Sequence, residues 1–221
     1  MNELTLLDWK RRIFELYAEI RRDDDAEHAW RNWRTVRDEL FRTHPQSPIP
    51  SERRASFAGL PFFDYDPSTR VVGNVEPAER MQREIATSGE QPYSFTRFAR
   101  TRFELAGEQH ALDLYWLDGY GGGLYLCFAD ATGGAETYGA GRYLLDTVKG
   151  ADLGERSGQL VLDFNFSYNP SCSYDPQWVC PLAPSGNRLG IPIRAGERFP
   201  NRGETRSARR VRAGRARAGT R

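Results

Sequence analysis

The sequence predicts an α+β fold that is mainly β: an antiparallel meander, forming a sandwich or a partly open barrel, with an N-terminal helical hairpin packed against it. Residues 1–44 repeat apolar side chains at three- and four-residue intervals, which indicates helices with one buried face. From Phe57 onward the pattern changes to short segments typical of strands. The short connections between them favour antiparallel neighbours, because parallel strands need crossovers of about a dozen residues.

Two helices are predicted within residues 1–44. The first has one apolar stripe, formed by Leu6, Trp9, Ile13, Leu16 and Ile20. Thr5 followed by Asp8 resembles a capping box at its start. The second helix follows a run of acidic residues, and its apolar stripe is formed by Trp30, Trp33, Val36 and Leu40. It should end at His44, because Pro45 disfavours helical geometry in the residue before it.

The remaining chain is predicted to form strands joined by tight turns. Two short strands are expected around the turn at residues 66–69. Further strands are expected in residues 83–88, 93–107, 110–118, 123–130 and 160–166. In the third of these segments Leu112, Leu114 and Trp116 share one face, which indicates a sheet that is buried on one side.

Charge divides the chain into two parts. Residues 198–221 contain nine arginines and one acidic residue, Glu204, so their net charge is +8. Because the whole chain carries +1, residues 1–197 carry −7. We expect residues 1–197 to form a single domain, with a helical hairpin in 1–44 and a β-rich part in 57–197.

The arginine-rich tail has too few apolar residues to fold and is expected to be disordered. One hypothesis is a nucleic-acid or membrane-surface arm that binds phosphate groups. The alternative is a solvated extension, which is favoured because residues 206–221 contain no aromatic side chain for base stacking.

The sequence indicates a cytoplasmic protein. It has no apolar segment of about 20 residues that could cross a bilayer, and the order of charges at its N-terminus does not fit a secretory signal. The three cysteines, Cys127, Cys172 and Cys180, are therefore expected to be reduced. An odd number of cysteines also fits a disulfide framework poorly.

Two polar segments follow the ends of predicted strands. They are "DATGGAETYGAGRYLLD", residues 130–146, and "DFNFSYNPSCSYDPQWVCPLAPSGNRL", residues 163–189. Loops at strand ends are common locations for ligand sites, because the scaffold is rigid and the loops are free to vary. The second segment is rich in proline and asparagine, which suits a long cover over a sheet with a site beneath it.

These segments also carry a resemblance to a known family. "GAETYGAGRYLLD", the second segment and "IPIRAGE" resemble the signature of domain of unknown function 1684, an uncharacterised prokaryotic family. The resemblance extends upstream to "HPQSPI" and "FAGLPFFDYD" and covers most of the chain up to Glu197. It implies no established activity, and the arginine-rich tail lies beyond it.

Arg142 and Asp163 are the charged residues that this region singles out. The Arg142 guanidinium could clamp a carboxylate or phosphate through two parallel hydrogen bonds. Alternatively, it forms a structural pair with Glu136 or Asp163. Asp163 and Asn165 are predicted on one face of a strand, with phenylalanines on the other. An apolar environment there would disfavour the ionised carboxylate, so Asp163 could act as an acid or base. Alternatively, both side chains bond loop amides.

Cys172 and Cys180 allow three interpretations. They lack the spacing of a zinc knuckle, so a metal would need further ligands, for which His44, Glu136 and Asp175 are the candidates. A nucleophilic Cys172 would need a base, for which His44 remains. Buried, reduced thiols are the favoured interpretation.

Three functional hypotheses follow. The first is a pocket for a small molecule, in particular an anionic one, with Glu136 and Asp163 as acid/base groups and Arg142 as an anion clamp. Its ligand would be oriented by Tyr138, Asn165, Asn169 and Tyr174. The second is a non-enzymatic binding or interaction module in which the polar segments are structural, and the third is a structural metal at the cysteine pair. The glycine-rich segments fit neither a P-loop nor a dinucleotide fingerprint, so the sequence indicates no particular cofactor.

Overall fold

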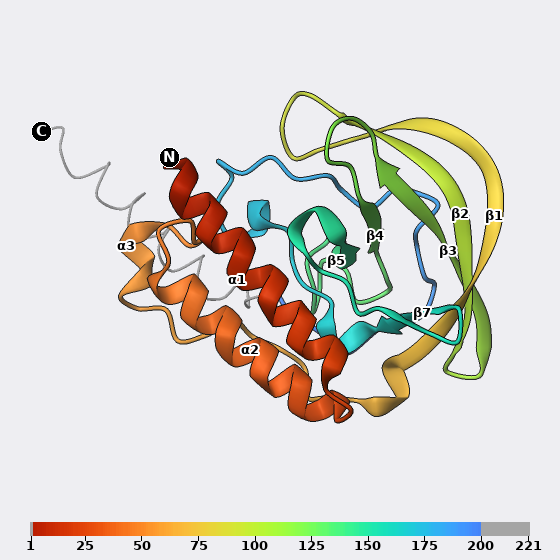
Figure 1. Cartoon of the computed structure of the whole chain (residues 1–221), viewed down its shortest axis with the longest axis horizontal. Coiled ribbons are helices and arrows are strands. Elements are labelled where there is room, and N and C mark those ends of the chain that lie inside the picture. Colours follow the sequence, from red (N-terminus) through yellow and green to blue (C-terminus); the bar gives the residue numbers. More distant parts are fainter. Residues whose placement is uncertain (1, 200–221) are drawn as a thin grey trace, which may run out of the picture.

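A computed structural model describes residues 2–199 and shows two antiparallel helices beside a curled sheet (Figure 1). Helix α1 spans Glu3–Arg22 and helix α2 spans Ala26–Thr43, and a short helix α3 follows at Ser51–Arg54. Helix α2 ends at the C-cap His44, as predicted. Nothing in the described part of the chain forms a helix both long enough and apolar enough to cross a membrane.

The start of α1 differs from the predicted capping box. The side chain of Asn2 accepts a hydrogen bond from the Leu4 backbone N–H and so caps the helix. Thr5 lies inside the first turn, where its hydroxyl donates to the Asn2 carbonyl at 2.7 Å. Leu6, which was assigned to the buried stripe, is exposed to solvent. The buried face of α1 therefore begins one helical turn later than predicted.

The two helices pack against the sheet through aromatic side chains of α2. The indole of Trp33 is fully buried, with its ring 5.4 Å from that of Phe62 and 5.1 Å from that of Phe166. Its N–H donates to the Tyr17 hydroxyl of α1 at 3.2 Å. The indole of Trp30 donates to the Asn165 carbonyl at 3.0 Å. These contacts join both helices to the segment that follows the last strand of the sheet.

The sheet has seven strands in the order β5-β4-β3-β2-β1-β7-β6, and every neighbouring pair is antiparallel. The strands are β1 Arg70–Ile85, β2 Tyr93–Leu105, β3 Glu108–Leu117, β4 Leu124–Phe128, β5 Arg142–Asp146, β6 Glu155–Arg156 and β7 Gln159–Asp163. The first five strands form the predicted meander, and β7 and β6 extend it on the other side of β1. The sheet curls into a half-barrel, which agrees with the predicted partly open barrel and mainly β composition.

Several strand boundaries differ from those predicted. β1 is one long strand where two separate strands were expected, and an irregularity in register between Pro77 and Met81 accommodates the proline. Residues 61–65 form no strand and make only one isolated bridge, between Phe62 and Glu197. β5 was not predicted, because all five of its residues are buried and its sequence therefore lacks alternating polarity.

A long segment without strands, residues 167–199, lies across the sheet and is hereafter the strap. It makes isolated bridges to the rest of the fold, which pair Tyr143 with Tyr168, Thr87 with Pro181, Ala129 with Arg188 and Phe62 with Glu197. Arg198 and Phe199 also bond to the body, through the carbonyls of Pro61 and Glu136. The rest of the predicted disordered tail lies outside the described residues.

Replacing Trp33 by alanine should strongly destabilise the protein, because the indole is fully buried among aromatic rings of both layers. We expect Trp33→Ala to lower the free energy of unfolding by about 3–5 kcal/mol. Urea denaturation measures the change. Trp116→Ala is the matched control, because Trp116 is 44% exposed. It should cost less than about 1 kcal/mol, and equal losses in the two variants would contradict the assigned core.

Candidate functional site

Arg142, at the start of β5, is fully buried. Its guanidinium donates to the Asp130 carboxylate at 2.8 Å, to the Ile193 carbonyl at 2.9 Å and to the Ala195 carbonyl. Burial lowers the pKa of Arg142, and the Asp130 charge opposes that shift. Arg142 therefore forms a structural ion pair, but its partner is Asp130. The partners predicted from the sequence were Glu136 and Asp163.

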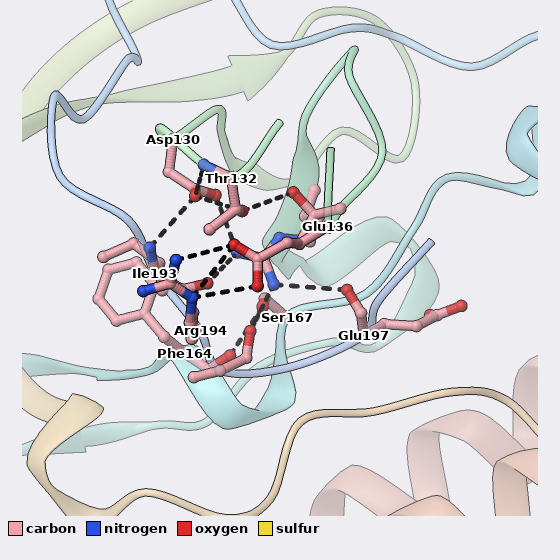
Figure 2. A network of polar contacts seen from close by, with 11 residues as sticks. Asp130, Thr132, Glu136, Phe164, Ser167, Ile193, Arg194 and Glu197 are labelled. Carbon is pink, nitrogen blue, oxygen red and sulfur yellow. Dashed lines mark hydrogen bonds and ion pairs between the residues drawn. The ribbon is translucent and has the colours of Figure 1, made fainter. Parts of the chain in front are cut away.

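Asp130 joins the strap to the loop before β5. One of its carboxylate oxygens binds Arg142, and the other accepts hydrogen bonds from the backbone N–H of Thr132 at 2.8 Å and of Ile193 at 3.2 Å (Figure 2). Both oxygens are therefore occupied. The buried pair is bonded on the acidic side by backbone donors and on the basic side by strap carbonyls, and Nε is the only nitrogen of the Arg142 guanidinium without a partner in the described structure.

Glu136 lies near the surface and pairs with Arg194 of the strap. The Arg194 Nε is 3.1 Å from each carboxylate oxygen (Figure 2). This hydrogen bonding lowers the pKa of Glu136, so the group is ionised at neutral pH. The environment opposes the use of Glu136 as a general acid, because a low pKa disfavours its protonated form.

Asp163 ends β7 and is fully buried. One carboxylate oxygen accepts from the backbone and side-chain nitrogens of Asn165 at 3.0 and 2.9 Å, and the other accepts from Arg70 at 3.0 Å. Burial raises the pKa of Asp163, and the bonds from Arg70 and Asn165 oppose the increase. The predicted alternation of faces is wrong here, because Phe164–Phe166 form a 3-10 turn in which Phe164, Asn165 and Phe166 are all buried.

The Asn165 side chain holds the turn before β1. Its oxygen accepts from the Asp66 N–H at 2.9 Å, and its nitrogen donates to the Asp66 carbonyl at 2.9 Å and to the Thr69 hydroxyl at 3.0 Å. Two roles for Asn165 were predicted from the sequence, and this arrangement matches the structural one, in which the side chain bonds the backbone of a loop.

Asn169 and Tyr174 converge on Glu197, which sequence reasoning did not select. The Glu197 carboxylate is fully buried and accepts from the Asn169 N–H at 3.1 Å, from Arg37 at 3.4 Å and from the Tyr174 hydroxyl. Burial raises the pKa of Glu197, and the Arg37 charge opposes that shift. No pattern around Glu197 distinguishes it in the sequence, because its partners come from α2 and the strap.

The cysteines and His44 occupy different surroundings. Cys172 is half-buried, with its sulfur 3.9 Å from the Tyr138 hydroxyl, and Cys180 is buried. The Nε2 of His44 lies 3.1 Å from Asp8, and its Nδ1 accepts from the Gln46 N–H at 3.1 Å. Within residues 2–199 no three His, Cys, Asp or Glu side chains are grouped so that they could hold a metal ion.

A groove of about 470 Å³ lies between the sheet and the strap. Its walls come from the end of β1, from β2 and β3, and from strap residues 182–186. The polar side chains that line it are Arg83, Glu84, Arg97, Asp113, Tyr115 and Ser185. None of the seven residues predicted for catalysis or ligand binding lines this groove.

Arg97 is a half-buried cation of the groove, with 20% of its side chain exposed. Its Nη1 is 3.6 Å from Asp113, whose other carboxylate oxygen binds Arg100 at 2.7 Å. The Arg97 Nε is inaccessible to solvent and has no hydrogen-bond partner. Tyr115 lies in the same wall, and burial raises the pKa of its hydroxyl to about 12, so it remains a hydrogen-bond donor at neutral pH.

The strap is held beside the groove by Asn187. Its side-chain oxygen accepts from the Asp113 N–H at 2.9 Å, and its nitrogen donates to the carbonyls of Asp113 at 3.0 Å and Cys127 at 2.9 Å. The amide thus takes the place of a strand partner for β3 and β4. Sequence reasoning did not select Asn187, which is one of many asparagines in a polar segment.

A family model described as "Protein of unknown function (DUF1684)" matches residues 55–198. The chain belongs to the DUF1684 family. This confirms the resemblance found in the motifs. The DUF1684 match spans the entire sheet and the strap, including every residue that lines the groove, and leaves α1 and α2 outside.

A solved structure is similar to the chain in sequence and in fold. The solution NMR structure of an uncharacterized protein from Haloarcula marismortui is 34% identical to this DUF1684 chain, with a TM-score of 0.57. The similarity covers 78% of this chain and 93% of the archaeal one. No curated protein matches the chain.

The Arg142–Asp130 pair should be essential for stability. Arg142→Met leaves Asp130 buried without its cation, so we expect the free energy of unfolding to fall by about 3–5 kcal/mol. Urea denaturation measures the loss. Arg194→Met is the control, because its pair with Glu136 is largely exposed and should contribute little to stability. A small effect at Arg142 would show that the buried pair does not hold the strap.

Glu197→Gln should change the pH dependence of stability. Because its pKa is raised above the ordinary 4.5, Glu197 stabilises the fold most fully below that pH, and the contribution is lost as pH rises through the folded pKa. The unfolding free energy of the wild type minus that of Glu197→Gln should therefore fall as pH rises above 4.5. Urea titrations across the acidic and neutral range measure this difference.

Glu136→Gln is the matched control with the opposite sign. The pKa of Glu136 is lowered, so its contribution is present above 4.5 and is lost as pH falls. The corresponding difference should rise with pH in the acidic range. The same slope for both variants would contradict the assigned environments.

Proposed function

We propose that this DUF1684 domain binds a small anionic molecule in the groove between the sheet and the strap. The observation that carries the proposal is Arg97, which lines the groove with 20% of its side chain exposed and makes only long contacts in the described structure, at 3.6 Å to Asp113 and 3.4 Å to the Glu79 carbonyl. A guanidinium that is held only by such long contacts has donors left for a carboxylate or phosphate ligand.

The groove has the chemistry of a small-molecule site. Its volume of about 470 Å³ lies within the range usual for such sites. Arg97 and Tyr115 supply donors, and the exposed Arg83 adds a second guanidinium. Two carboxylates, Glu84 and Asp113, also line the groove, and Asp113 is already paired with Arg100 at 2.7 Å. Two guanidinium groups and a protonated phenol favour a carboxylate or phosphate ligand.

The predicted acid/base groups are already bonded to other protein groups, which favours a binding site over a catalytic one. Asp163 bonds Arg70 and Asn165, and Glu136 bonds Arg194, and neither residue lines the groove. We assign Asp163, together with Arg142 and Asn165, to holding the strap and its surrounding turns in place. The rigid strap then forms one wall of the site, which lies beneath the proline-rich cover as the sequence suggested.

A second candidate is a protein-interaction module, which the outer face of α1 favours. Leu4 is 73% exposed, and Leu7 lies one turn further along the helix at 41%. The helix pair lies outside residues 55–198, which the DUF1684 model matches.

The proposed function is tested by calorimetric titration of the full chain with citrate and with inorganic phosphate as probes. Wild-type protein should bind at least one probe, and Arg97→Gln should weaken that binding at least about 10-fold, which corresponds to about 1.4 kcal/mol. Arg102→Gln is the matched control, because Arg102 is on the same strand but pairs with Glu76 at the surface. Binding of neither probe, or equal binding by both variants, would contradict the proposal and favour the interaction module.

A further inference from the structure

A small cavity lies between the helical hairpin and the strap. Its volume is about 60 Å³, which is room for about four water-sized groups. Its walls come from α1, from α2, from Lys149 and from strap residues 168–171. The walls are therefore complete only when both helices pack against the strap. The cavity shares no lining residue with the groove that contains Arg97.

Arg37 of α2 lines this cavity with most of its hydrogen-bonding capacity unused. Its side chain is 7% exposed, and its only hydrogen bond within residues 2–199 is a long one, 3.4 Å from Nη2 to Glu197. Its Nε is inaccessible to solvent and has no partner. The rings of Trp33, Phe41 and Tyr168 lie 4.8–5.0 Å from the central carbon of the guanidinium. These rings stabilise the charge but leave the Nε–H without an oxygen acceptor.

Asn169 of the strap lines the same cavity and has the complementary deficit. The residue is 2% exposed, and its side-chain nitrogen donates to the Arg198 carbonyl at 2.9 Å. Its side-chain oxygen is buried and has no partner in the described structure. Leaving a buried donor or acceptor unpaired is costly. A molecule that accepts from Arg37 and donates to the Asn169 oxygen would remove both costs.

Two tyrosine hydroxyls add donors to the cavity. The Tyr17 hydroxyl accepts from the Trp33 indole at 3.2 Å, and neither it nor the Tyr168 hydroxyl donates to another group within residues 2–199. Burial raises the pKa of both phenols, that of Tyr17 to about 12, so both keep their protons at neutral pH. Free donors thus outnumber free acceptors, which favours a ligand that is rich in acceptor oxygens.

The charges of the lining residues favour the same kind of ligand. Arg37 and Lys149 are both cations, and no aspartate or glutamate is among the described residues that line the cavity. The acidic partners of the two cations, Glu197 and Asp146, lie outside the lining. Cations with free N–H groups bind carboxylates through charge-assisted hydrogen bonds.

We propose that this cavity binds a small hydroxy acid of about the size of glycolate. The carboxylate accepts hydrogen bonds from Arg37 and from the hydroxyls of Tyr17 and Tyr168, and the ligand hydroxyl donates to the Asn169 oxygen. The site is separate from the groove and does not depend on the function proposed for it, because the two cavities have no lining residue in common.

Calorimetric titration of the full-length protein with glycolate tests this site, and acetate is the matched control ligand because it lacks only the hydroxyl. Glycolate should bind, and acetate should bind at least about 10-fold more weakly, because it leaves the Asn169 oxygen without a donor. Absence of glycolate binding, or equal binding of the two acids, would overturn the proposal.

Tyr168→Phe tests the location of the ligand without disturbing the pair of Arg37 and Glu197. The hydroxyl that it removes has no partner within residues 2–199, so the melting temperature should stay unchanged while glycolate affinity falls at least about 10-fold. Tyr120→Phe is the matched control, because Tyr120 is fully exposed, and it should bind as wild type does. Arg97→Gln should also bind glycolate normally. Weaker binding in Arg97→Gln with normal binding in Tyr168→Phe would place the ligand in the groove and overturn the inference.

Discussion

The buried Arg142 guanidinium is the interaction on which the strap depends. The strap has no strand of its own in the described structure, so it lacks the ladder of backbone bonds that holds the rest of the sheet. Arg142 replaces part of that ladder, because it binds the carbonyls of Ile193 and Ala195 while Asp130 neutralises its charge. One side chain on β5 thereby satisfies carbonyls that would otherwise be buried without donors.

Other buried polar side chains hold the strap to the rest of the fold in the same way. Asn187 bonds the backbone of β3 and β4, and Glu197 accepts bonds from Asn169, Tyr174 and Arg37. Each polar group of this kind is costly to bury alone and is tolerated because its partners are already in place. The residues that looked functional in the sequence are thus mostly the ones that hold irregular backbone. The Arg97 groove lies beside this framework, between the sheet and the strap.

Much of the fold was predictable because its signals are local. The end of α2 follows from Pro45, and the meander follows from short turns between alternating segments. β5 and the continuity of β1 were missed for physical reasons. A strand buried on both faces has no alternation to detect, and Pro77 interrupts the pattern of β1 without ending the strand, because the irregular register accommodates it.

The sequence by itself determined the helical hairpin, the antiparallel β class, the family and the two segments that are rich in polar residues. Only the tertiary structure decided which charges meet: Arg142 pairs with Asp130, Asp163 with Arg70, and Glu197 with Arg37. The groove likewise combines β1, β2, β3 and the strap, which are distant in the chain. Periodicity and turn signals act between residues a few positions apart, whereas ion pairs and cavities depend on how whole elements pack.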